Sequence, residues 1–204
     1  KLVKTTFLDE DLNKILRLTS ANSINVGRLI PQIFYYVYAY SRFKENKDLV
    51  FSVPSGNFGN LTAGIIAMEM GLPVNKFIAS TNINKVVPEY LRTGIFSPAS
   101  SFQTISNAMD VGNPSNFDRI LDLFDHSFEK AKDKIDGFYF TDAETKSAMK
   151  EMYSKFNYIV DPHGAVGYLG FKGYLRSHPE SAGICLGTAH PAKFLDVVKP
   201  TLGQ

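Results

Sequence analysis

The arrangement of residues 48–80 constrains the fold of this chain more than any other feature of its sequence. Leu49–Val53 is a short apolar run that ends in a Pro-Ser-Gly turn, which is typical of a buried strand. A helix-forming stretch follows at Leu61–Met70 and is terminated by Gly71. Phe77–Ser80 has the composition of a second strand. Strand, helix and strand in this order predict a right-handed βαβ unit, the building block of a parallel sheet.

Helical periodicity dominates the middle of the chain. Apolar residues recur at steps of three and four along Phe117–Ile135, which predicts one amphipathic helix of about five turns. Ser115 and Asp118 resemble a capping box at its start. Thr141 and Glu144 form a similar pair, and they predict a second helix that runs to about Phe156. Further helices are predicted from Val166 to about Leu175 and around Ala192–Val198.

Four apolar segments are expected to share one mostly parallel sheet. They lack the alternation of polar and apolar residues that a solvent-exposed sheet face produces, so helices should cover both faces. The four segments are Leu49–Val53, Phe77–Ser80, Tyr158–Val160 and Ala182–Leu186. The sequence therefore predicts an α/β domain of three layers, similar to the Rossmann fold.

The composition excludes several classes of protein. With 44% hydrophobic and 21% charged residues among 204, the chain is neither disordered nor a disulfide scaffold. Its formal net charge of +2 gives no electrostatic reason to expect a nucleic acid or a membrane as partner. Ile30–Tyr40, the most apolar run, is about half as long as a membrane-spanning helix. The lone Cys185 cannot form an internal disulfide, so we expect a cytoplasmic location.

The loop between the first predicted strand and its helix has the residues of an anion site. Gly56, Asn57, Gly59 and Asn60 lie directly before the helix begins. Successive backbone N–H groups in front of a helix N-terminus form a cradle for phosphate, and glycines allow the backbone to approach the anion closely. The spacing is neither G-x-G-x-x-G nor that of a P-loop. The alternative is an ordinary strand-to-helix turn.

Two further segments carry candidate binding residues. Thr188 follows the predicted strand Ala182–Leu186, at the sheet edge where ligands of α/β proteins bind. Asn25 and Arg28 are three residues apart and would share one face of a helix, where they suit an oxyanion. The alternatives are a helix cap for Thr188 and a surface ion pair for Arg28.

Other catalytic patterns are missing from the sequence. Its four histidines do not have the spacing of zinc ligands, and we expect no metal site. No G-x-S-x-G motif is present. His163 lies close to Asp161 and Gly164, where it would either line a site or mark the start of a helix.

Five motifs in order resemble the threonine synthase family. They cover most of the chain and favour this family over other β-family, or fold-type II, pyridoxal-phosphate enzymes. The motifs are Asn-Ser-Ile-Asn-Val-Gly-Arg-Leu-Ile-Pro-Gln (22–32), Val-Pro-Ser-Gly-Asn-Phe-Gly-Asn-Leu-Thr-Ala-Gly (53–64), Ser-Asn-Ala-Met-Asp-Val (106–111), Asp-Pro-His-Gly-Ala-Val-Gly-Tyr (161–168) and Thr-Ala-His-Pro-Ala-Lys-Phe (188–194).

The resemblance implies a fold, a reaction and a set of site residues. The fold would be the C-terminal large domain of a fold-type II pyridoxal-phosphate enzyme. The reaction would be that of a lyase that converts O-phosphohomoserine and water to threonine and phosphate. The residues that match the cofactor site of the family are Gly56, Asn57, Phe58, Gly59 and Asn60, around the cofactor phosphate, and Thr188, at the pyridine nitrogen. Those that resemble the substrate-phosphate site are Ser23, Asn25 and Arg28.

The resemblance also implies a missing part. The Schiff-base lysine of the family lies in a Phe-Lys-Asp-type segment, and neither Lys47-Asp48 nor Lys132-Asp133 has that context. We therefore expect the C-terminal portion of a threonine synthase, inactive alone and without a catalytic residue. Residues 1–21 would link back to an N-terminal domain, and residues 22–204 would form the cofactor-binding domain. The alternatives are another β-family pyridoxal-phosphate lyase and a non-catalytic module that binds a phosphate or a nucleotide.

Overall fold

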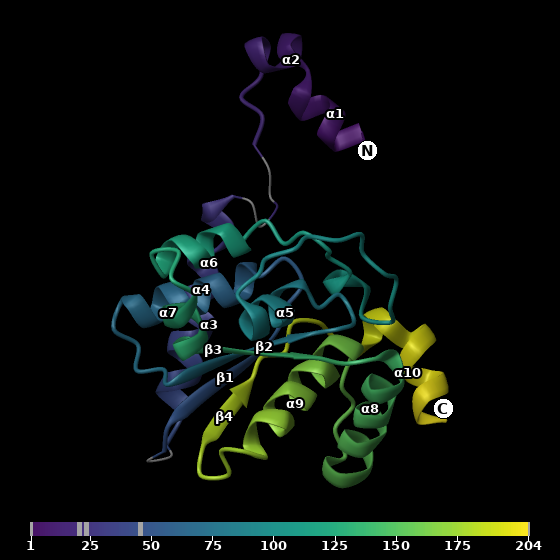
Figure 1. Cartoon of the computed structure of the whole chain (residues 1–204). Helices are drawn as coiled ribbons and strands as arrows, with labels where there is room; N and C mark the ends of the chain where they lie inside the picture. Colours follow the sequence, from purple (N-terminus) through teal and green to yellow (C-terminus); the bar gives the residue numbers. More distant parts are fainter. Residues whose placement is uncertain (1, 20–21, 23–24, 45–46, 204) are drawn as a thin grey trace.

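A parallel four-stranded sheet forms the centre of the protein in a computed structural model, which describes residues 2–19, 22, 25–44 and 47–203. The strands have the order β3-β2-β1-β4, so the first two strands in sequence lie in the middle of the sheet. Phe51 of β1 lies beside Phe77 of β2 and Ile184 of β4. The strand bounds are β1 Leu49–Pro54, β2 Lys76–Thr81, β3 Ile135–Tyr139 and β4 Ala182–Cys185. The expected α/β class with a parallel sheet is confirmed (Figure 1).

One expected strand is wrong, and one strand was missed. Tyr158–Val160 forms no strand but a connection between two helices, whereas β3 (Ile135–Tyr139) pairs with β2 at the edge of the sheet. The predicted helix 117–135 is divided into α6 (Phe117–Leu123) and α7 (Phe128–Lys134). The chain turns between them, because Asp125 and His126 have left-handed backbone angles, with φ of 53° and 54°. The apolar residues thus keep a helical spacing through the turn at Asp125 and His126 and into the first residue of β3.

The predicted capping box at Ser115 is also wrong. Asn116 occupies the N-cap position of α6 and makes no side-chain capping bond there. Ser115 instead binds Asn57, whose side-chain oxygen accepts hydrogen bonds from the Ser115 backbone N–H at 2.7 Å and from its hydroxyl at 3.1 Å. The second predicted box is confirmed, since Thr141 and Glu144 cap each other at the start of α8 (Asp142–Phe156).

Aromatic side chains fill the space between one face of the sheet and the helices above it. Phe51 and Phe77 project from β1 and β2, and Tyr36 packs against both rings at centroid distances of 5.0 and 6.1 Å. Phe117 is fully buried in the same cluster. The helices on this face are α3 (Ile30–Arg42), α4 (Gly59–Glu69), α5 (Val86–Thr93), α6 and α7 (Figure 1).

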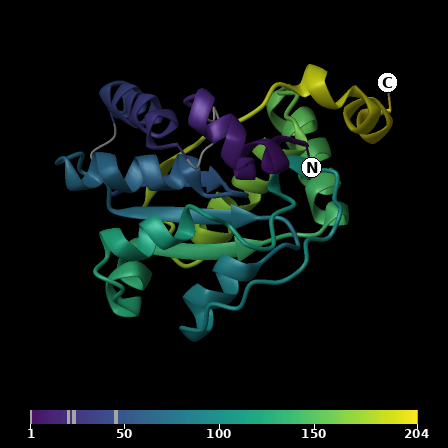
Figure 2. The same ribbon diagram turned by 90° about the horizontal axis from the view of Figure 1, so that it is seen from above.

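A single helix, α9 (Pro162–Leu175), covers the opposite face at very short range. Its glycines make this approach possible: a Cβ atom on Gly170 would lie 1.8 Å from the Ser80 hydroxyl oxygen. Ser52 of β1 donates a hydrogen bond to the carbonyl of Gly167 at 2.6 Å. Helix α8 packs beside α9, and α10 (Leu195–Leu202) packs against α8 (Figures 1 and 2).

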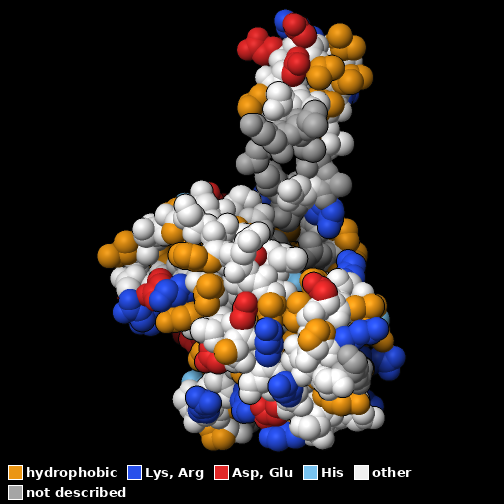
Figure 3. Space-filling model, turned by 90° about the vertical axis from the view of Figure 1, so that its right-hand side faces the viewer, with side chains coloured by type: hydrophobic (Ala, Val, Ile, Leu, Met, Phe, Trp, Pro, Cys, Tyr) orange, Lys and Arg blue, Asp and Glu red, His pale blue; other side chains and the backbone are white. Residues whose placement is uncertain are grey.

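Two short helices precede the α/β body. They are α1 (Leu2–Leu8) and α2 (Glu10–Ile15), and Asp9 caps the second by accepting the backbone N–H groups of Asp11 and Leu12. Figure 3 shows this segment projecting away from the body, with acidic and hydrophobic side chains at its outer end. None of the helices among the described residues is long and apolar enough to cross a membrane.

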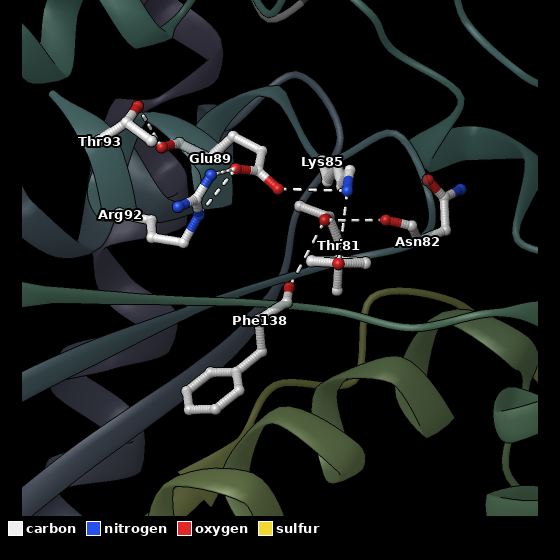
Figure 4. Close-up of polar contacts among 8 residues, drawn as sticks. Thr81, Asn82, Lys85, Glu89, Arg92, Thr93 and Phe138 are labelled. Atoms are coloured by element: carbon white, nitrogen blue, oxygen red, sulfur yellow. Dashed lines mark hydrogen bonds and ion pairs between the residues drawn. The ribbon is translucent and has the colours of Figure 1, made fainter. Parts of the chain in front are cut away.

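A polar cluster outside the cleft joins the start of α5 to the end of β3, where Lys85 lies 3.3 Å from the Tyr139 hydroxyl. Lys85 lies 3.1 Å from Glu89, whose carboxylate also binds Arg92 at 2.6 Å (Figure 4). Hydrogen bonds from Arg92 and Lys85 hold the pKa of Glu89 below its ordinary value. The three side chains bind one another and Tyr139 on the surface, so this cluster serves the fold.

Candidate functional site

A cleft of about 820 Å³ opens at the carboxyl edge of the sheet, where β1 and β4 end. This is the edge at which ligands of open α/β sheets bind. Five separate segments form its walls: the start of α3 with the preceding η1 turn (Val26–Arg28), residues 54–60, the η2 turn (Asn107–Met109), the start of α9, and residues 186–194. The last segment contains the η3 turn (Pro191–Phe194).

The loop before α4 is held in shape by its side chains. Phe58 has a left-handed conformation, with φ of 62°, and its buried ring packs against Phe117 at 6.1 Å. Asn60 joins both ends of the loop, because its amide donates to the Pro54 carbonyl at 2.8 Å and its side-chain oxygen accepts from the Leu61 N–H. These contacts turn the backbone, rather than the side chains, toward the cleft.

Two other positions of the loop are fixed by their neighbours. The Asn57 side chain is bound to Ser115 and so connects the loop to the start of α6. Gly56 lies against the η2 turn, since a Cβ atom there would be 2.6 Å from the Ala108 carbonyl oxygen and 2.7 Å from the Met109 Cα. Any other residue at position 56 would therefore displace the backbone that faces it.

The start of α4 offers unpaired hydrogen-bond donors to the cleft. Phe58 is the N-cap of this eleven-residue helix and provides no side-chain cap. Over the part of the chain that the structure describes, no acceptor takes the backbone N–H groups of Phe58, Gly59 and Asn60. Three successive free N–H groups at the positive end of a helix dipole are the geometry that binds a phosphate group.

Thr188 lines the same cleft from the segment after β4. The predicted strand Ala182–Leu186 is confirmed with slightly different bounds, and its carboxyl end carries Thr188 past the loop that contains Gly56. The side chain is exposed, and its hydroxyl has no hydrogen-bond partner among the described residues. It is therefore available to a ligand in the cleft.

The predicted substrate residues divide between the cleft and its border. Arg28 lines the cleft from the end of η1. Asn25 instead caps η1, since its side-chain oxygen accepts the Gly27 N–H at 2.9 Å, and it is not among the lining residues. Ser23 lies outside the described residues.

Lys193 is a lining residue that sequence reasoning did not single out. It follows Thr188 by five positions, within the motif Thr-Ala-His-Pro-Ala-Lys-Phe, and its position there was the available signal. Arg28 and Lys193 carry the formal charges of the described lining residues, and no Asp or Glu is among them. The cleft is thus positively charged and suits an anionic ligand.

His163 is buried and bound on both ring nitrogens at the inner end of the cleft. Its Nδ1 lies 2.9 Å from a carboxylate oxygen of Asp161, and its Nε2 lies 3.3 Å from the backbone nitrogen of Ala108. Burial alone would raise the pKa of Asp161, but the hydrogen bonds from His163 outweigh burial and lower it. The prediction that His163 marks a helix start is confirmed, because Asp161 caps α9 and His163 lies in its first turn. His163 also lines the cleft.

Comparison with known proteins identifies the relatives of the chain. No protein-family model matches it. Threonine synthase of Haemophilus influenzae is 47% identical over 204 residues, which are 99% of this chain and 47% of the relative. The crystal structure of threonine synthase from Escherichia coli matches the whole chain with 44% identity and a TM-score of 0.89. The chain is homologous to threonine synthase along its whole length.

The relationship to the threonine synthases extends to a structure with cofactor. Pyridoxal-phosphate-bound threonine synthase from Brucella melitensis is 31% identical to this chain, with a TM-score of 0.87, and the chain covers 49% of it. The expected fold of the fold-type II pyridoxal-phosphate enzymes is confirmed. The chain spans about half the length of the curated threonine synthases it matches. The described residues contain no group of three or more His, Cys, Asp or Glu that could hold a metal ion.

Proposed function

We propose that this chain supplies the phosphate-binding half of a threonine synthase active site. The whole enzyme would convert O-phosphohomoserine and water to threonine and phosphate, with pyridoxal phosphate as cofactor. The observation that carries the proposal is the row of free N–H groups at Phe58, Gly59 and Asn60. They lie in a positively charged cleft of a chain that is homologous to threonine synthases.

The loop residues fit the phosphate group of the cofactor. The N–H groups of Phe58, Gly59 and Asn60 would donate to the phosphate oxygens, and the positive end of α4 would stabilise their negative charge. The side chains of Asn57 and Asn60 are engaged in holding the loop, so they would keep these donors in place without touching the cofactor. Bound pyridoxal phosphate supplies an electron sink for negative charge on the substrate.

Thr188 would receive the pyridine nitrogen of the cofactor. A carboxylate at this position would favour a protonated ring, whereas a threonine hydroxyl is neutral and donates a hydrogen bond without giving up its proton. The pyridine ring would therefore stay largely unprotonated, and it would withdraw less electron density from the substrate. A reaction of several steps, with elimination followed by hydration, is compatible with this weaker withdrawal.

A second anion would bind at the outer part of the cleft. Arg28 and Lys193 line the cleft from two different segments, and both are positively charged. O-phosphohomoserine has a phosphate group of its own, which a guanidinium and an ammonium group would bind by charge-assisted hydrogen bonds. Asn25 and Ser23, which the resemblance links to the substrate phosphate, complete the proposed substrate site.

The remaining half of the protein would complete the site. We propose that it supplies the lysine that binds the cofactor covalently, and that residues 1–21 connect the two halves. Helix α3 supports this proposal, because it presents aromatic side chains to solvent beside the cleft. Phe34, Tyr35 and Tyr38 are 67, 66 and 63% exposed, and such apolar surfaces commonly mark a contact with another protein segment.

The proposal is tested by titrating the chain with pyridoxal phosphate, followed by borohydride reduction and peptide mapping. We expect weak binding, no label on one specific lysine and no threonine production. Co-expression with the other half of the protein should restore tight binding and activity. Stoichiometric labelling of one lysine of this chain would contradict the proposal. Equal affinity for a nucleotide and for pyridoxal phosphate would instead favour a non-catalytic phosphate-binding module.

A further inference from the structure

We infer that His163 is a positioning residue that sets the distance between three walls of the cleft. The ring contacts the η2 turn through Nε2, the η3 turn through its face, and Asp161 at the start of α9 through Nδ1. The inference rests on the proposed function only in naming pyridoxal phosphate as the ligand of the cleft. The contacts themselves concern the protein alone.

Asp161 fixes the ring of His163. One carboxylate oxygen of Asp161 accepts both the backbone N–H of His163 and its Nδ1–H, each at 2.9 Å. The side chains of both residues are 3% exposed, so water does not compete for these bonds. Because the carboxylate requires a donor, the proton of the neutral imidazole lies on Nδ1, and Nε2 keeps its lone pair.

The lone pair on Nε2 holds the wall that faces the phosphate loop. The backbone N–H of Ala108 donates to Nε2 at 3.3 Å. Directly beyond, the carbonyl of Ala108 and the Cα of Met109 lie against Gly56, with no room for a Cβ atom. A displacement of the η2 turn would therefore displace Gly56, which is two residues before Phe58, the first of the three proposed phosphate donors.

The face of the ring contacts the wall that follows Thr188. The ring of Phe194 lies 4.9 Å from the imidazole, centre to centre, with an angle of 52° between the planes. Phe194 ends η3, which also carries Lys193. His163 thus contacts the segment that carries both Thr188 and Lys193, the proposed ligands of the pyridine nitrogen and the substrate phosphate.

The η2 segment has a second attachment that does not involve His163. Asp110 accepts hydrogen bonds from the Asn82 amide at 2.9 Å and from the Thr104 hydroxyl at 2.7 Å. The Asn84 amide lies 3.3 Å from the same oxygen. Loss of the His163 contact should therefore loosen the turn at Ala108 without unfolding the segment.

The test compares two amide variants of the chain. In His163→Asn the side-chain amide reaches the position of Nδ1 and can bind Asp161, but it offers Ala108 no acceptor. In His163→Gln the side-chain oxygen reaches the position of Nε2 and can replace that acceptor. We expect the Asn variant to exchange the Ala108 amide hydrogen about fivefold faster or more. We expect it also to bind pyridoxal phosphate more weakly, while the Gln variant stays close to the natural protein in both measurements.

Thermal unfolding of both variants provides the control. Similar melting temperatures with different exchange and binding support the inference, because a purely structural residue would alter stability and binding together. Equal behaviour of the Asn and Gln variants would overturn it. If the natural chain does not bind pyridoxal phosphate, the proposed function fails. The inference is then decided by the exchange rate of the Ala108 amide in the two variants.

Discussion

The two faces of the sheet are covered in different ways. On one face, α9 approaches so closely that Gly170 leaves no space for a methyl group beside Ser80. Helix α8 then packs against α9, and α10 packs against α8. On the other face, α3 and α4 lie over a thick aromatic layer, and the outer side of α3 exposes Phe34 and Tyr38 to solvent.

The two faces therefore have different roles, since one mainly stabilises the domain and the other contributes to completing the site. The α9 face is closed, and the start of α9 supplies His163 to the cleft, with Asp161 holding its ring. The α3 face is open on its outer side, and the η1 turn and the first turns of α3 supply one wall of the cleft, with Arg28 and Tyr35. Substitutions on the closed face should therefore change the stability of the domain. Substitutions on the open face should instead change its association with other protein surfaces.

The largest effect is expected from Gly170→Ala on the closed face. The new methyl group would overlap the Ser80 hydroxyl and lie 3.0 Å from its Cβ, so α9 or β2 has to shift. Overpacking of this kind lowers the free energy of unfolding by about 1–3 kcal/mol. Denaturant unfolding measures the loss. Ser80→Ala in the same chain should recover part of it, and Gly187→Ala, which has nothing within 4 Å, should have almost no effect.

A smaller effect is expected from Tyr36→Phe, because the Tyr36 hydroxyl joins α3 to the loop before α4. The Tyr36 hydroxyl donates to the Asn60 carbonyl at 2.6 Å, and its burial raises the pKa of the phenol. The variant keeps the ring contact with Phe51 but loses the hydrogen bond, which contributes about 1 kcal/mol. We expect that loss in chemical unfolding, together with weaker binding of phosphate ligands. Unchanged binding would show that α3 does not support the loop.

A still smaller effect is expected from Glu151→Gln, where α8 packs against α9. Glu151 binds Lys155 and Lys172, both at 2.7 Å, and these bonds lower its pKa to about 2. Its contribution to stability is complete above the unfolded pKa near 4.5 and is lost as the pH falls toward 2. Glu151→Gln should therefore lower the free energy of unfolding by less than about 1 kcal/mol at pH 7. A difference that persists at pH 2 would contradict this account.

The smallest change in stability is expected on the open face. Phe34→Ser combined with Tyr38→Ser replaces two exposed rings of α3, and little buried contact is lost. We expect an almost unchanged melting temperature and a clear decrease in self-association of the chain, measured by sedimentation velocity. A large loss of stability would mean that these rings belong to the core, and unchanged association would remove the evidence for a covered face.

Local signals in the sequence predicted much of this architecture. The βαβ unit around Leu49–Val53 and the helix start at Asp161 were correct, because apolar runs and capping residues act over a few positions. The strand Ile135–Tyr139 was missed, since its identity depends on pairing with β2, far away in sequence. The turn at Asp125 and His126 also has no glycine or proline to mark it.

The site was predictable to a similar degree. The anion loop and Thr188 were singled out from their places after strands, and the structure brings both to one cleft. The roles within the loop were not predictable, because only tertiary contacts reveal that Asn57 binds Ser115 and Asn60 binds Pro54. Lys193 was overlooked although it lies within the motif Thr-Ala-His-Pro-Ala-Lys-Phe, because the motif does not show which of its side chains line the cleft.

The most direct test of the central claim is a map of the backbone amide resonances that pyridoxal phosphate shifts. The account predicts the largest changes at Phe58, Gly59 and Asn60, with smaller changes at Thr188. Inorganic phosphate should shift the same three amides, and pyridoxal, which has no phosphate group, should leave them almost unchanged. Equal shifts with pyridoxal, or changes confined to another part of the surface, would contradict the assignment of this loop as the phosphate site.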